Sequence, residues 1–259
     1  MIDETSLNII RLSAERLVKP VRLVVFTKDR DSSLSMQACE LSQVIKAQSD
    51  KVALESYDVV MDRDKTEQYG IQRAPAVVVE GGDGQAIVFY GSIKYRFLEV
   101  IMHTIQAISV TGPWLPAGVL QSLQRLHEDV RIRVFAKNDC PRCRSVAEIA
   151  IGLALACDRI KVSIIMVEDF PELTKKYNIS IFPKIIFGEN HQADGTLSES
   201  EFLERVFQAK GELPGMDKYC LVCGAPSSDI ICKACKTRIQ AEALDHKLKI
   251  ERQKQPDIP

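Results

Sequence analysis

Residues 130–156 read VRIRVFAKNDCPRCRSVAEIAIGLALA, and this stretch decides the fold. The apolar, β-branched run at 130–136 predicts a strand, and a helical pattern begins at Pro141. Cys140 and Cys143 therefore lie where a strand ends and a helix begins. Pro141 favours the first helical turn because it has no N–H to leave unpaired there. The order strand, Cys-x-x-Cys, helix indicates an α/β unit that carries a chemically active cysteine pair.

The placement of Cys140 favours nucleophilic chemistry. The first turn of a helix has unpaired N–H groups and the positive end of the helix dipole, which together stabilise a thiolate. Lys137, Arg142 and Arg144 add positive charge nearby in the sequence. We therefore expect Cys140 to attack a disulfide and Cys143, one turn further in, to resolve the mixed disulfide. The alternative, in which the pair is half of a metal site, needs two more ligands close by.

The sequence contains a repeat at an offset of 108 residues. The matching positions are Tyr69 with Tyr177, Ile71 with Ile179, and Pro75 with Pro183. An apolar run follows both prolines, so each proline is expected to begin a strand. Each unit then reads strand, helix, strand, helix, strand, strand, helix. The strand–helix–strand order predicts a parallel pair with a right-handed crossover, and the last two strands form a hairpin.

The predicted elements give an α/β protein made of two tandem thioredoxin-like domains, each a mixed sheet flanked by helices. The strands of the first unit are expected at 21–27, 52–60, 75–80 and 86–90, and its helices at 33–48, 63–69 and 94–109. The strands of the second unit are expected at 130–136, 160–167, 183–188 and 191–196, and its helices at 141–156, 170–177 and 198–209. An amphipathic helix precedes the first unit. Gly- and Pro-containing segments place the domain boundaries at 1–112, 113–212 and 216–259.

The first unit lacks the cysteine pair. The offset places Ser32 and Ser35 opposite Cys140 and Cys143. Serine cannot form a disulfide, so we expect this unit to be redox-inactive and to complete an interface or shape a binding surface. The alternative, a hydrolytic role for Ser32, has no histidine in a recognisable triad context to support it.

These features resemble the glutaredoxin-like protein disulfide oxidoreductases, a family with tandem thioredoxin folds. The resemblance covers roughly residues 1–210 and rests on the N-terminal helix, the Arg-Ala-Pro-Ala segment at 73–76 and the Cys-Pro-x-Cys of the second unit. The N-terminal domain of the alkyl hydroperoxide reductase flavoprotein is similar, because its first unit also lacks the pair.

The resemblance implies a role for each site residue. Cys140 would be the attacking thiol, Cys143 the resolving thiol, and Pro183 a cis proline against the disulfide that opens the backbone of Phe182 to an extended substrate. It also implies protein disulfide substrates and electrons from a thioredoxin-reductase-like flavoprotein. In that family the first unit often has its own cysteine pair, so the serines found here put two-site activities such as isomerisation in doubt.

The last segment carries two further Cys-x-x-Cys pairs, formed by Cys220, Cys223, Cys232 and Cys235. This spacing suits a tetrahedral Cys₄ zinc site in a small zinc-ribbon-like module followed by a charged helix. A structural zinc would stabilise a segment too short to bury an ordinary core. An iron centre or another redox pair is the alternative.

The zinc module also suggests a second function. Its Cys-Gly-Ala-Pro-Ser-Ser and Cys-Lys-Ala-Cys segments resemble the small zinc module of tRNA-thiolation enzymes. The alternative to a dithiol–disulfide oxidoreductase is therefore an adapter or sulfur-relay protein that docks such a partner. The charged residues of 237–254 read as a solvated helix, or alternatively as a phosphate-binding face.

Composition excludes several classes of function. The net charge is −1, from 34 basic and 35 acidic residues, which gives no reason to expect a nucleic-acid partner. No apolar run approaches the ~20 residues of a membrane helix, and the N-terminus has no secretory signal pattern. We therefore expect a cytoplasmic protein with no membrane contact. Cys39 and Cys157 lie in apolar helical patterns and are expected to be small packed side chains.

Overall fold

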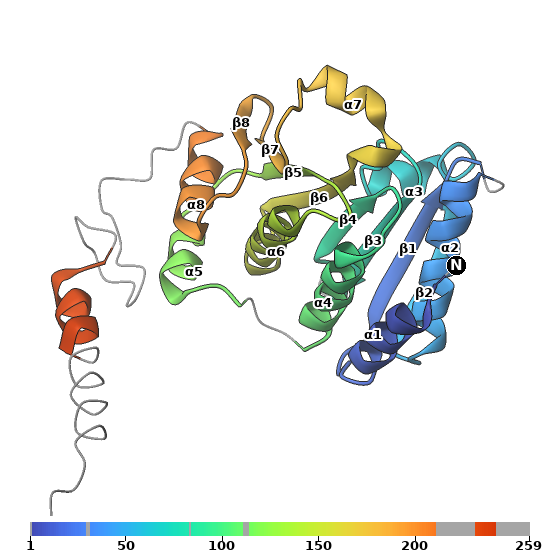
Figure 1. Ribbon diagram of the computed structural model, residues 1–259, viewed down its shortest axis with the longest axis horizontal. Coiled ribbons are helices and arrows are strands. Elements are labelled where there is room, and N and C mark those ends of the chain that lie inside the picture. Colours follow the sequence, from blue (N-terminus) through green and yellow to red (C-terminus); the bar gives the residue numbers. More distant parts are fainter. Residues whose placement is uncertain (1, 30–31, 83, 111–113, 211–230, 242–259) are drawn as a thin grey trace, which may run out of the picture.

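The computed structural model describes residues 2–29, 32–82, 84–110, 114–210 and 231–241. Its centre is one eight-stranded mixed sheet with the strand order β2-β1-β3-β4-β6-β5-β7-β8 (Figure 1). The strands are β1 (Val21–Thr27), β2 (Val52–Asp58), β3 (Ala76–Gly81), β4 (Ala86–Tyr90), β5 (Val130–Ala136), β6 (Ile160–Met166), β7 (Lys184–Phe187) and β8 (His191–Asp194). Every strand expected from the sequence is present, with ends that differ by no more than two residues.

The two halves of the sheet repeat one topology. In each half the first strand pairs in parallel with the second and antiparallel with the third, which forms a hairpin with the fourth. The two halves also join, which the sequence pattern does not predict. β4 pairs in parallel with β6, with Ile87 opposite Val162 and Tyr90 opposite Ile165, so the two units share one continuous sheet.

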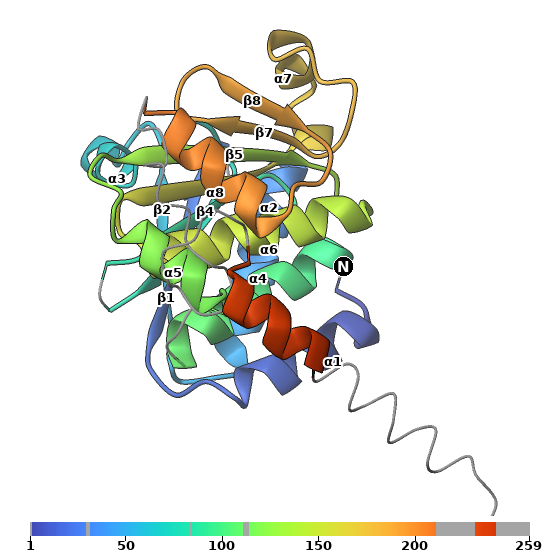
Figure 2. The ribbon, with the colours of Figure 1, turned by 90° about the vertical axis from the view of Figure 1, so that its left-hand side faces the viewer.

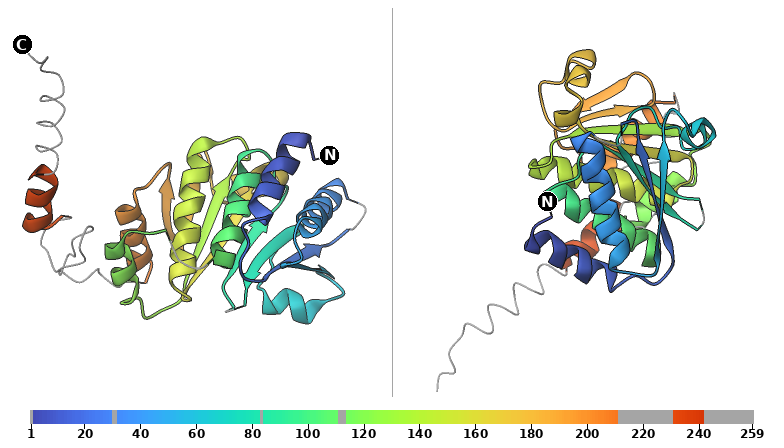
Figure 3. Two further views of the ribbon diagram at one scale, coloured as in Figure 1. Left: turned by 90° about the horizontal axis from the view of Figure 1, so that it is seen from below. Right: turned by 90° about the vertical axis from the view of Figure 1, so that its right-hand side faces the viewer.

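The helices cover the two faces unequally. They are α1 (Glu4–Ala14), α2 (Ser33–Ala47), α3 (Arg63–Gln68), α4 (Arg96–Val110), α5 (Ala117–Leu123), α6 (Pro141–Ala156), α7 (Pro171–Lys176) and α8 (Glu199–Gln208), with a 3-10 turn η1 (Val167–Asp169). Figure 2 shows the long helices on one side of the sheet and the short helices α3 and α7 on the other. α1 packs beside α4, and α4 packs beside α6, so helices of both units form one layer (Figure 3).

The apolar core follows this layering. The larger cluster lies under the long helices and runs through both units, from Leu23 and Phe89 to Ile132 and Phe202. The smaller cluster lies on the face of α3 and α7 and includes Phe135. Successive residues of β5 therefore face opposite layers, as the pleat of a strand requires.

The helix α5 was not expected from the sequence. It is short, it contains Gly118, and it follows Pro116 in a segment that reads as a linker. It contacts α6 and α8 and buries Val119 and Leu123. Packing against the second unit therefore stabilises a helix that local propensity alone does not predict. Among the described residues, no helix combines the length and the apolar character needed to span a bilayer.

Candidate active site

Cys140 and Cys143 form a disulfide at the start of α6, with their Cα atoms 5.2 Å apart. β5 ends at Ala136, and residues 137–139 lead directly into the helix. Cys140 is the N-cap residue, and Pro141 occupies the first helical turn. The structure thus brings the two cysteines together at the position that the sequence predicts.

The two sulfurs have different environments. Cys143 is fully buried, whereas Cys140 is only half-buried and lies at the surface end of the pair. The backbone N–H of Cys143 donates a hydrogen bond to Sγ of Cys140 over 3.2 Å. The same N–H would stabilise a thiolate on Cys140 once the disulfide is reduced. This arrangement suits Cys140 to contact a partner and Cys143 to act from inside.

The Phe182–Pro183 peptide bond is cis, as the family resemblance implies. Pro183 is buried, and it directly precedes β7. The ammonium group of Lys137 lies 4.7 Å from the centroid of the Phe182 ring, and the backbone N–H of Cys140 donates to the carbonyl of Lys137 over 3.2 Å. These contacts connect the cis peptide segment with the loop that leads to the disulfide.

The charge around the pair differs from the sequence expectation at Arg144. Its guanidinium forms ion pairs with Glu99 of α4 and, over 3.1 Å, with Glu148 of α6. Burial alone would lower the pKa of Arg144, but the two carboxylates raise it above its ordinary value. Arg144 is therefore neutralised locally and joins the two units, which leaves Lys137 and Arg142 as the nearby cations that lack a carboxylate partner among the described residues.

Glu148 also contacts the imidazole of His103 on α4, with Nδ1 of His103 3.9 Å from Oε1 of Glu148. The His103 imidazole and then the Arg144 guanidinium lower the pKa of Glu148 below its ordinary value, against the effect of burial. His103 in turn stacks on Trp114 at 4.5 Å between ring centroids. These contacts clamp α6 to the first unit.

A buried polar junction holds the loop before the disulfide. Asn138 is almost fully buried. Its Oδ1 accepts a hydrogen bond from the backbone N–H of Lys94 over 2.8 Å, and its Nδ2 donates to the carbonyl of Ser92 over 2.9 Å. Nδ2 and the backbone N–H of Asn138 also donate to Oε2 of Glu168 over 3.2 and 3.1 Å. Residues of both units thus fix the position two residues before Cys140.

Asp169 extends the junction. Its Oδ2 accepts hydrogen bonds from the backbone N–H of Ser92 over 2.6 Å and from the Ser92 hydroxyl over 2.8 Å. Gly91 has a φ of +92°, and a Cβ there would lie 2.6 Å from Oδ2 of Asp169. Only glycine fits this position without displacing the carboxylate.

The first unit keeps the geometry of the pair without its chemistry. Ser32 is the N-cap of α2, and its Oγ accepts a hydrogen bond from the N–H of Ser35 over 3.2 Å. The hydroxyl of Ser32 also donates to Oγ of Ser35 over 2.9 Å. The Ala74–Pro75 bond is cis, like Phe182–Pro183. The serines therefore occupy the positions of the two sulfurs in a matching framework.

Comparison with known proteins agrees with this framework. Residues 130–208 match the family described as a thioredoxin domain. This stretch is therefore similar to a thioredoxin domain. The cysteine pair, α6 and the cis proline all lie within it.

Crystal structures of two proteins share the fold across both units. The N-terminal domain of alkyl hydroperoxide reductase AhpF from Enterococcus faecalis is 20% identical, with a TM-score of 0.70 over 80% of this chain and 100% of that chain. A protein disulfide oxidoreductase from Aeropyrum pernix K1 is 20% identical, with a TM-score of 0.73 over 82% of this chain and 96% of that chain. No curated protein sequence matches the chain. The expected tandem thioredoxin-like fold is thereby confirmed.

The predicted metal ligands are only partly described. Cys220 and Cys223 lie outside the described residues, as does most of the segment 216–259. Within the described part, residues 233–241 are helical, Cys235 is buried, and its N–H donates to Sγ of Cys232 over 3.4 Å. No group of three or more metal-ligating side chains occurs among the described residues.

The residues of the buried polar junction are not predictable from the sequence pattern. Asn138 is 30 positions from Glu168 and 46 from Ser92. Such contacts leave no periodic pattern, because they depend on how the two units dock. The nearest available signal was the polar Asn138 placed between an apolar strand and the Cys140 helix.

Proposed function

We propose that the protein is a dithiol–disulfide oxidoreductase that exchanges electrons with protein disulfides through Cys140 and Cys143. The observation that carries this proposal is the disulfide at the start of α6, with a surface-facing Cys140 and a fully buried Cys143. A pair with one accessible and one shielded sulfur separates the attacking thiol from the resolving thiol.

The reaction proceeds in two exchanges. The Cys140 thiolate attacks one sulfur of a substrate disulfide, so that a mixed disulfide forms and the other substrate sulfur leaves as a thiolate. The Cys143 thiolate then attacks Sγ of Cys140 and releases the second substrate thiolate. The substrate gains two electrons, and the protein returns to the Cys140–Cys143 disulfide.

Pro183 is proposed to position the substrate, because it follows Phe182, whose ring contacts Lys137 of the loop that leads to Cys140. The first unit is proposed to act as a redox-inactive partner that holds this loop through Ser92 and Lys94. Domain limits of 1–112 and 113–212 agree with such a division of roles.

Reduction of insulin disulfides driven by dithiothreitol tests the proposal. The full chain should accelerate the reaction, and Cys140→Ser should abolish the acceleration. Cys157→Ser is the matched control, because Cys157 is a half-buried free thiol at the other end of α6. Equal activity of the Cys140→Ser variant and the wild type would overturn the assignment. An adapter, by contrast, would tolerate Cys140→Ser and lose its partner when residues 216–259 are deleted.

The electron donor is proposed to be a flavoprotein of the thioredoxin-reductase type in the cytoplasm. The likeness to the AhpF domain supports this class of donor, and a reducing compartment would return Cys140 and Cys143 to the dithiol. NADPH oxidation in a mixture of such a flavoprotein, the full chain and insulin would test it. No NADPH oxidation above that of the flavoprotein alone would argue against this donor.

A structural zinc ion is proposed at Cys220, Cys223, Cys232 and Cys235. The N–H of Cys235 donates to Sγ of Cys232, and such a hydrogen bond would orient that sulfur as a metal ligand. Bound zinc would hold the C-terminal module together. Metal analysis of the purified full chain should find one zinc per chain, and Cys232→Ser should release it. Iron in place of zinc, or a zinc content unchanged by Cys232→Ser, would contradict the assignment.

A further inference from the structure

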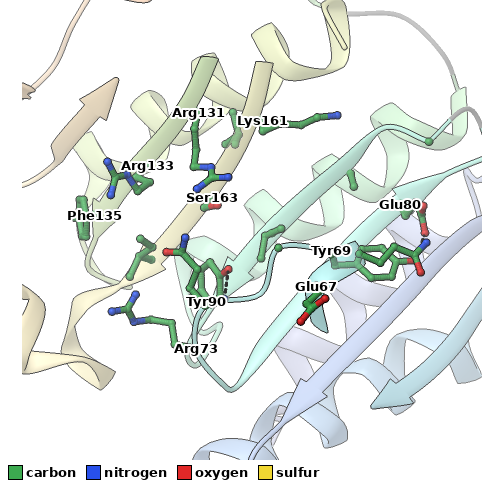
Figure 4. Close-up of a pocket in the computed structure, with 18 of the residues that line it drawn as sticks. Glu67, Tyr69, Arg73, Glu80, Tyr90, Arg131, Arg133, Phe135, Lys161 and Ser163 are labelled. Atoms are coloured by element: carbon green, nitrogen blue, oxygen red, sulfur yellow. Dashed lines mark hydrogen bonds between the residues drawn. The ribbon is translucent and has the colours of Figure 1, made fainter. Parts of the chain in front are cut away.

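A groove of about 400 Å³ opens on the face of the sheet that α4 and α6 leave uncovered (Figure 4). Strands β4, β5 and β6 form its floor, so both units contribute to it. Tyr69 and Arg73 after α3 line one wall, and Tyr177 after α7 lines the other. The disulfide belongs to the opposite helix layer, so the proposed redox chemistry does not use this groove.

Cations gather on one side of the groove. Arg131 and Lys161 are direct neighbours in the register of β5 and β6, and Arg133 lies beside Ser163 two residues further along. Figure 4 shows Arg131 and Arg133 on these strands, with the Lys161 side chain extending away from them. Arg73 lies on the wall, with its guanidinium 5.8 Å from the centroid of the Phe170 ring. Like charges opposite one another destabilise a sheet. A bound anion would relieve this repulsion.

The two carboxylates that line the groove, Glu67 and Glu80, do not pair with these cations. Among the described residues, none of Arg73, Arg131, Arg133 and Lys161 forms an ion pair with an acid. Of the two lining acids, Glu80 is bonded to Arg22 and to the hydroxyl of Tyr69. The other, Glu67, is exposed on α3.

Arg133 is held in place by two hydrogen bonds, but one of its N–H donors has no hydrogen-bond partner among the described residues. Its Nη1 donates to the hydroxyl of Tyr177 over 3.2 Å, and its Nη2 donates to the carbonyl of Gly188 over 2.8 Å. Its Nε is buried and has no hydrogen-bond partner among the described residues. A buried donor left unpaired costs free energy, and a positioned guanidinium is suited to binding phosphate or carboxylate oxygens.

We propose that this groove binds a small polyanion that carries phosphate or carboxylate groups. Arg133 and Arg131 would bind the anionic groups, and Lys161 would add a third positive charge. A groove of about 400 Å³ holds a ligand of metabolite size rather than a folded partner. Because it lies away from the disulfide, this site is independent of the proposed redox function.

Isothermal titration calorimetry of the full chain at low salt tests the proposal. Pyrophosphate is the phosphate probe and citrate the carboxylate probe. At least one should bind with 1:1 stoichiometry, and Arg133→Gln should weaken its binding about tenfold to a hundredfold through loss of charge-assisted hydrogen bonds. Arg131→Gln should also weaken binding, and its exposed side chain makes it the variant least prone to misfold. Arg11→Gln is the matched control, because Arg11 is also exposed but lies on α1 and does not line the groove.

Three results would overturn the proposal. The first is the absence of binding heat with both probes. The second is equal affinity of the Arg131→Gln variant and the Arg11→Gln control. Binding of an acidic peptide such as hexaglutamate or of an RNA oligonucleotide, without binding of either small anion, would also overturn it and assign the groove to a macromolecule. Insulin reduction by Arg131→Gln should equal that of the wild type, so failure here and failure of the redox assignment are distinguishable.

Discussion

Replacement of Asn138 by alanine should destabilise the protein and slow its redox reaction together. The substitution removes three side-chain hydrogen bonds, to Lys94, Ser92 and Glu168, from a buried position. Two of these bonds join neutral groups and contribute about 1 kcal/mol each, and the bond to the carboxylate contributes somewhat more. The free energy of unfolding should therefore fall by about 3 kcal/mol, which corresponds to a loss of about 6–12 °C in Tm for a protein of this size.

Urea unfolding of the oxidised proteins measures this difference directly. Asp139→Ala is the matched control, because Asp139 is the next residue of the same loop and its side chain is exposed. It should change the free energy of unfolding by less than about 0.5 kcal/mol. Insulin reduction should fall in Asn138→Ala and not in Asp139→Ala, since Asn138 fixes the chain two residues before Cys140. Equal destabilisation by the two substitutions would refute the view that the junction holds the loop.

Three further results are expected. Cys143→Ser should accumulate a mixed disulfide between Cys140 and its substrate, visible as a reducible adduct on a non-reducing gel, because the buried resolving thiol is gone. Absence of an adduct would contradict the assignment of Cys140 as the attacking thiol and Cys143 as the resolving thiol. The Ser32→Cys, Ser35→Cys double variant should form a second disulfide, detected as two fewer alkylatable thiols by mass spectrometry, because the two hydroxyls are 2.9 Å apart in a matching framework; two freely alkylated thiols under oxidising conditions would contradict this. The pKa of Glu148 is lower in the folded protein than in the unfolded chain, so its contribution to stability is complete above about pH 5 and is lost as the pH falls through the folded-state pKa. Glu148→Gln should therefore reduce the pH dependence of the free energy of unfolding, measured by urea titrations from pH 6 to about pH 3. An unchanged pH dependence would show that Glu148 does not stabilise the folded protein in this way.

The sequence predicts the elements of the fold more closely than the contacts between them. The repeat at an offset of 108 residues aligned Ser32 and Ser35 with the cysteine pair and Pro75 with Pro183, and it predicted the topology of each unit. The cis bond was expected from the family resemblance and only at Pro183, whereas the structure has a second one at Pro75. α5 was missed because its sequence resembles a linker and its stability comes from packing on α6 and α8. Periodicity describes which face of an element is apolar, and it carries no record of which other element covers that face.

The partners of the charged side chains were likewise not predictable from the sequence. Arg144 looked like a local cation for Cys140, yet Glu99 lies 45 residues away in sequence and neutralises it. The groove cations Arg131 and Arg133 alternate with apolar residues on β5, a pattern typical of a half-exposed strand. Only the shared sheet shows that they line one groove together with Lys161 and Arg73.

The parallel pairing of β4 with β6 also constrains how the chain can change. An isolated second unit would expose the apolar edge strand β6, whose Ile164 is fully buried in the whole protein. Bare edge strands recruit other chains and promote aggregation. The first unit therefore covers an edge strand of its neighbour, and β4 does this whether or not its own unit carries cysteines. Substitutions at Ser32 and Ser35 leave this protection in place, whereas loss of β4 would remove it.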